Sequence, residues 1–169
     1  MISWPAHKRV IRVVIAAGMF TLFSRTLALS SEPLDLNPNP NLTPQQVVEF
    51  QLDALRHNDE PTPDAGIERS FRFASPSNRL VTGPLAHFSE IVHSTAYSPL
   101  LKSQASEVRG VVVEEDQARV YVTVTSANGA QLNFLFMLSR QGEGDYNDCW
   151  MTDSVMKLPP EENAIQNAI

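Results

Sequence analysis

The chain has 169 residues, which gives room for one domain and a short tail. Residues 1–30 hold four basic residues and no acidic ones. The rest of the chain therefore keeps 9 of the 13 Lys and Arg residues against 19 Asp and Glu, a net charge of −10. A domain this acidic repels a phosphate backbone, which argues against nucleic acid as a partner. The single cysteine, Cys149, excludes a disulfide within the chain.

The N-terminal segment has the pattern of a secretory signal peptide. Basic residues stand within 8–12, an apolar run follows at 13–23, and small residues occupy 28–30. The run is shorter than the roughly 20 residues that a membrane span needs. We expect residues 1–30 to be removed and the mature chain to be exported without a stable membrane span. Its destination would be the periplasm or thylakoid lumen in a bacterium or cyanobacterium, or else the medium. An uncleaved anchor is the alternative.

A proline- and asparagine-rich segment, residues 31–41, predicts a flexible spacer before the folded domain. The first helix is predicted to begin after Thr43, because Thr43 and Gln46 have the spacing of a capping box and Pro44 suits the first turn. Apolar residues then recur on one side at helical spacing, and Gln51 is the polar member of that stripe.

Two shorter helices are predicted next. Residues 67–74 form the second, which the segment "SPSN" at 75–78 is expected to stop, and residues 84–94 form the third, with Pro84 at its start. Four stretches rich in β-branched or alternating residues predict strands, namely 107–115, 118–126, 131–140 and 147–155. Helices followed by strands indicate an α+β fold with about three helices packed on an antiparallel sheet of about four strands.

The segment "ANG" at 127–129 allows a sharper prediction of strand register. A two-residue turn at Asn128 and Gly129 mixes apolar and polar residues on both faces of the hairpin. A three-residue loop, 127–129, with Gly129 in the left-handed conformation shifts the pairing of the two strands by one residue, so that different side chains share a face. One face then carries Val120, Val122, Val124, Leu132, Phe134, Phe136 and Leu138. The other face carries Tyr121, Leu135 and Met137 among polar residues, and we expect it to be able to meet a second copy in a homodimer.

The segments "VVEFQLDALRHND", "FRFASPSNRLVTGPLAHF", "AYSPLL" and "CWMTDSV" together resemble the uncharacterised domain of unknown function 4864 family. That family is similar to the cone-shaped α+β domains of the nuclear transport factor two-like superfamily, whose fold is also described as cystatin-like. The resemblance covers roughly residues 42–158 and leaves 159–169 as a disordered tail. It implies a strongly curved sheet over helices with a pocket at the open end of the cone. It implies no activity and no cofactor.

Two residues of the last predicted strand are candidates for chemistry. Alternation places Cys149 on one face with Met151, Asp153 and Val155, and Trp150 on the other with Thr152 and Ser154. Cys149 beside Asp148 lacks the cationic neighbour that a nucleophilic cysteine needs, so we expect it to pack in the core. Histidines and Glu90 on the third predicted helix lack metal-binding spacing, so no metal site is predicted.

Two functions follow from these observations. The first is a non-catalytic domain that binds a small apolar ligand or a protein partner, with ligand-binding residues Gln51, Phe73, Tyr97, Phe134, Phe136 and Trp150. The second is a small lyase or isomerase like ketosteroid isomerases and polyketide cyclases, with Asp153 as the base. It requires Asp153 to point inward among Phe134, Phe136 and Trp150, where burial would favour its neutral form. The resemblance implies that Trp150 is the inward residue, which favours a solvent-facing Asp153 and the binding function.

Overall fold

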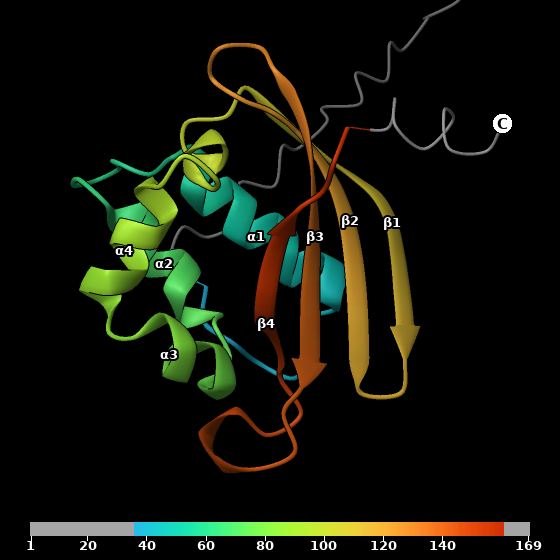
Figure 1. Cartoon of the computed structure of the whole chain (residues 1–169). Coiled ribbons are helices and arrows are strands. Elements are labelled where there is room, and N and C mark those ends of the chain that lie inside the picture. The colour runs from blue at the N-terminus through green and yellow to red at the C-terminus, as the bar shows by residue number, and fades with distance from the viewer. Residues whose placement is uncertain (1–35, 161–169) are drawn as a thin grey trace, which may run out of the picture. The chain divides into compact units, whose positions relative to one another are not determined.

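The computed structural model describes residues 36–160, so the predicted signal peptide and parts of the predicted spacer and tail lie outside the described residues. Helices precede strands in the chain (Figure 1): α1 (Pro44–Arg56), α2 (Ala65–Arg72), α3 (Pro76–Thr82), α4 (Leu85–His93), the 3-10 turn η1 (Ser98–Leu100), β1 (Ala105–Glu114), β2 (Gln117–Thr125), β3 (Gln131–Arg140), the 3-10 turn η2 (Gly144–Tyr146) and β4 (Trp150–Lys157). The strands form one open antiparallel sheet in the order β1-β2-β3-β4, which confirms the α+β class. Within the described residues, no helix has the length and apolar character that crossing a membrane requires.

Helix α1 begins as the capping box predicts. The Gln46 backbone N–H donates to Thr43 Oγ1 at 3.3 Å, and the Thr43 N–H donates to Gln46 Oε1 at 2.9 Å. The stripe on this helix is buried as a whole, including Gln51, which is 4% exposed. The stripe packs on the sheet, and α1 also packs against α2.

The segment 75–78 starts a helix, whereas the sequence pattern predicted that it would only stop one. The Ser75 side chain accepts a hydrogen bond from the Asn78 N–H at 3.1 Å, and Pro76 occupies the first turn of α3. Residues 36–160 therefore contain four α-helices instead of the predicted three or so. The signal was present in the sequence, because Ser75-Pro76 repeats the arrangement of Thr43-Pro44 at the start of α1.

The hairpin between β2 and β3 has the predicted three-residue loop. The Ser126 N–H donates to the Ala130 carbonyl at 2.9 Å, and Gly129 has a φ of +86°. Val120 lies opposite Phe136 and Val122 lies opposite Phe134, as the chosen register requires. The parity prediction is therefore confirmed, and one face of the sheet is almost entirely apolar.

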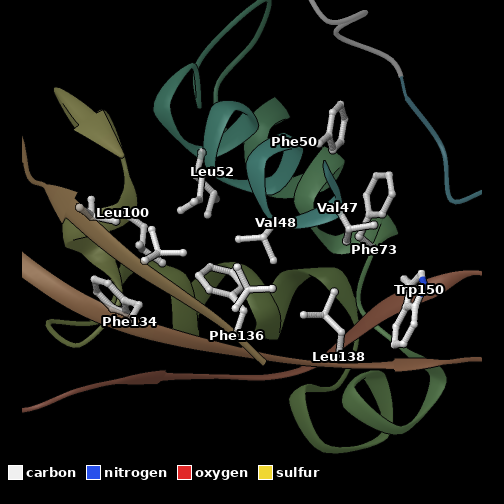
Figure 2. Close-up of a cluster of buried hydrophobic side chains, with 14 of the residues drawn as sticks. Val47, Val48, Phe50, Leu52, Phe73, Leu100, Phe134, Phe136, Leu138 and Trp150 are labelled. Carbon is white, nitrogen blue, oxygen red and sulfur yellow. The ribbon is translucent and has the colours of Figure 1, made fainter. Parts of the chain in front are cut away.

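This apolar face and α1 enclose the core of the domain. Figure 2 shows side chains of α1, among them Val48 and Leu52, directed at a row of side chains on β3. The β3 row consists of Phe134, Phe136 and Leu138, each at most 2% exposed. Trp150 closes the end of the core near Phe73, whose ring packs at a tilt of 51° against that of Phe50 with 4.9 Å between ring centroids.

Strand β4 contains a bulge that the sequence pattern did not predict. Thr152 lies opposite Leu138 and Ser154 lies opposite Met137, so Asp153 is the extra residue. Val155 consequently lies opposite Phe136, on the core face. This corrects the simple alternation, which placed Val155 on the face of Cys149 and Met151.

The face of the sheet away from α1 carries Tyr121, Leu135 and Met137, as predicted from the hairpin register. Leu135 is only 8% exposed, whereas Tyr121 and Met156 are exposed. Thr123 and Asn133 join across this face through a 2.8 Å hydrogen bond. The homodimer through this face stays a prediction.

Candidate functional site

A hollow with a mostly apolar lining lies between the helices and the β4 side of the sheet. It is a cavity of about 360 Å³. Its apolar wall comes from α1, α3, α4, η1, β3, β4 and the connection between α2 and α3. It consists of Leu55, Ala74, Val81, Phe88, Ile91, Val92, Leu100, Phe136 and Val155. This volume is at the lower end of the range typical of small-molecule sites, and a mostly apolar lining is also typical of them.

Gln51 lies on the cavity wall and is held by two hydrogen bonds. Its Nε2 donates to the Ser70 carbonyl oxygen at 3.1 Å, and its Oε1 accepts from Thr152 Oγ1 at 2.7 Å. An amide side chain has two N–H donors and two acceptor lone pairs on its oxygen. Within the described residues these two bonds leave one donor and one lone pair of Gln51 unused, and Gln51 is one of the residues that line the cavity.

Thr152 is fixed by the edge of the sheet. Its backbone N–H donates to the Phe73 carbonyl at 2.8 Å, and its carbonyl accepts from the Ser75 N–H at 2.9 Å. The Asn78 Nδ2 donates to the same carbonyl at 3.0 Å. The segment around Ala74 thus extends the edge of β4 and aligns the Thr152 hydroxyl with Gln51.

Tyr97 closes the cavity from the segment after α4. Its hydroxyl donates to the Val155 carbonyl oxygen at 2.9 Å, which ties this segment to β4. Helix α4 is tied to the α1–α2 connection in turn, because Ser89 Oγ donates to Asp64 Oδ2 at 3.1 Å and His93 Nε2 lies 3.0 Å from Asp64 Oδ1. Hydrogen bonds from Asn58 first, and then from these two residues, lower the pKa of the Asp64 carboxyl below its usual range.

The structure brings only part of the predicted ligand-binding set to the cavity. Gln51, Tyr97 and Phe136 line it. Phe73, Phe134 and Trp150 do not, because they fill the core between α1 and the sheet. Thr152 was not predicted as a site residue. The strand alternation nevertheless placed Thr152 on the same face as Trp150, which was expected to point inward.

Asp153 lines the cavity and does not join Phe134 and Trp150 in the core. It is half-buried at the bulge of β4, and its Oδ1 accepts from Ser139 Oγ at 2.9 Å and from Ser77 Oγ at 3.3 Å. Asp153 still belongs to the cavity lining, together with its neighbours Thr152 and Ser154. The bulge therefore gives Asp153 a third location, which is neither the core nor the open outer face.

Cys149 is 3% exposed and directly precedes β4. Burial, and then the charge of Asp148, raise the pKa of its thiol. Both effects disfavour the thiolate, which is the reactive form. Within residues 36–160, no group of three or more His, Cys, Asp or Glu side chains is placed to hold a metal ion.

The buried thiol predicts slow chemical modification of the native protein. Because Cys149 is the single cysteine, reaction with an aromatic disulfide reagent at pH 8 should be much slower in the folded protein than in 6 M guanidinium. Release of the coloured thiolate measures both rates. Equal rates with and without denaturant would show that the start of β4 is open to solvent.

A double-mutant cycle should measure the coupling between Gln51 and Thr152. Gln51→Leu leaves the buried Thr152 hydroxyl without its acceptor, whereas the Ser70 carbonyl keeps the hydrogen bond from the Phe73 N–H at 3.1 Å. The free energy of unfolding should therefore fall by about 1–3 kcal/mol. Adding Thr152→Val removes one unpaired group and should recover part of this loss. Urea denaturation measures all four variants. Strictly additive effects would contradict the coupling.

Comparison with known proteins gives a family and no activity. The model of the family described as "Domain of unknown function (DUF4864)" matches residues 39–165, which is most of the chain. The chain belongs to this DUF4864 family. The match includes every helix and strand around the cavity. No curated protein and no solved structure matches the chain.

Proposed function

We propose that this chain is an exported, non-catalytic domain that binds a small apolar ligand in the cavity between α1, α3, α4 and the β3–β4 side of the sheet. The cavity itself carries this proposal, because its wall is mostly apolar and has a small number of fixed polar groups. The Gln51–Thr152 pair supplies such groups in a buried position. A cone-like architecture similar to nuclear transport factor two is part of the proposal, and the placement of the cavity between helices and sheet supports it.

Catalysis with Asp153 as the base receives less support than binding. Two serine hydroxyls already donate to Asp153 Oδ1. Tyr97 is the other titratable residue among the described residues that line the cavity, and its hydroxyl donates to the Val155 carbonyl. The arrangement therefore lacks a second acid or base that is free to exchange a proton with a substrate.

Calorimetric titration with octan-1-ol tests the binding function. We expect one binding site in the full-length mature protein. Val92→Phe, which adds an aromatic ring to the cavity wall, should weaken binding by about tenfold or more, equivalent to about 1.4 kcal/mol. Val112→Phe is the matched control, because Val112 is exposed on the opposite face of the sheet and should leave the affinity unchanged. Absence of binding, or equal binding by both variants, would contradict the proposal.

The exported state has its own test. N-terminal sequencing of the protein from its native host should give a mature chain that starts close to Ser31. A chain that retains residues 1–30 would contradict export with cleavage and would leave the cavity proposal unaffected.

A further inference from the structure

The charge of the cavity wall differs from that of a site for an acidic lipid or metabolite. Among the described residues that line the cavity, none is Lys, Arg or His, and one, Asp153, is a carboxylate. The net charge of −10 on the chain after residue 30 adds a negative electrostatic potential. A fatty acid or another anion would therefore meet repulsion instead of a counter-ion.

Asp153 has hydrogen-bonding capacity that the protein itself leaves unused. Both of its hydrogen bonds reach the same atom, Oδ1, and they come from the neutral hydroxyls of Ser77 and Ser139. Within residues 36–160, Asp153 takes part in no ion pair, and its Oδ2 accepts no hydrogen bond. A cation that reaches this carboxylate gains a charge-assisted hydrogen bond.

From this wall we infer that the cavity selects a ligand with an apolar body and a positively charged amino group, whose ammonium binds Asp153. The inference rests on the proposed function and adds the chemical class of the ligand. The apolar body occupies the space bounded by Phe88 and Val92 of α4 and by Phe136 of β3, and Asp153 of β4 lines the same cavity. The two serine hydroxyls hold the carboxylate in place for this contact.

Three probes of equal chain length test the inference: octylamine, octan-1-ol and octanoate, titrated at pH 7 by calorimetry. The wild-type protein should bind octylamine about tenfold more tightly than octan-1-ol, because a hydrogen bond to a charged group is worth more than a neutral one. Octanoate should bind most weakly. Asp153→Asn, which keeps an acceptor for Ser77 and Ser139, should abolish the preference for the amine, so that octylamine binds no more tightly than octan-1-ol.

A matched control separates this contact from the general attraction of an acidic protein for amines. Asp145→Asn removes the same charge from an exposed residue outside the cavity, and the preference for octylamine should persist in this variant. If octan-1-ol binds but octylamine binds no better, or if Asp153→Asn and Asp145→Asn behave alike, the inference is overturned and the cavity proposal stands. If no probe binds, both are overturned.

Discussion

Gly66→Ala should lower the free energy of unfolding by about 3 kcal/mol or more, although alanine is usually the better helix former. A Cβ atom at this position in α2 would overlap the carbonyl oxygen of Ala54 and come within 2.6 Å of Asn58 Cα. Both are backbone atoms of α1 and its end, so no side-chain rotation relieves the overlap. The Gly66 N–H also donates to the Asn58 carbonyl at 2.8 Å, which fixes the close approach of α1 and α2.

A displacement of α2 from α1 should also disturb the cavity wall, because Gln51 of α1 donates a hydrogen bond to the carbonyl of Ser70 in α2. Urea denaturation measures the loss of stability. Gly142→Ala is the control, since a Cβ there meets nothing within 4 Å, and its stability should change by less than about 0.5 kcal/mol. Equal stability of Gly66→Ala and the wild type would show that α1 and α2 are not packed this closely.

Trp150→Ala should cost about 3–5 kcal/mol, through the lost burial of the indole and the cavity that remains. Trp150 is 8% exposed and joins the core cluster at the first position of β4, close to Phe73. Natural domains are stable by about 5–15 kcal/mol, so this loss threatens folding at ordinary temperature.

Met156→Ala provides the comparison within the same strand. Met156 is 43% exposed on the outer face, and its truncation should cost less than about 1 kcal/mol. Thermal and urea unfolding of the two variants should therefore differ clearly. A melting curve of Trp150→Ala that coincides with the wild-type curve would show that Trp150 does not close the core.

The fold was predictable from sequence where local chemistry and alternation agree. The capping box of Thr43 and Gln46 predicts the start of α1, and the three-residue loop ending at Gly129 predicts which side chains of β2 and β3 share a face. Both features depend on residues close together in the chain. Helix α3 was missed because "SPSN" was interpreted only as a stop, although Ser75 also caps a new helix.

The candidate site was less predictable, because it depends on contacts between distant segments. The polarity of Gln51 within an apolar stripe indicated an internal partner, yet that partner, Thr152, is 101 residues away. The bulge at Asp153 has no marker in the sequence such as glycine, and it moves Val155 to the cavity side. Aromatic residues were assigned to the ligand by type, whereas Phe134 and Trp150 are needed to fill the core.

The position of a bound molecule tests the cavity proposal most directly. Nuclear Overhauser effects between octan-1-ol and the methyl groups of the protein report that position in solution. We expect contacts from the octyl chain to Val92, Leu100 and Val155, which line the cavity, and none to Val112 or Met156 on the outer side of the sheet. Contacts confined to Val112 and Met156, or the absence of any contact with the cavity methyl groups, would contradict the account.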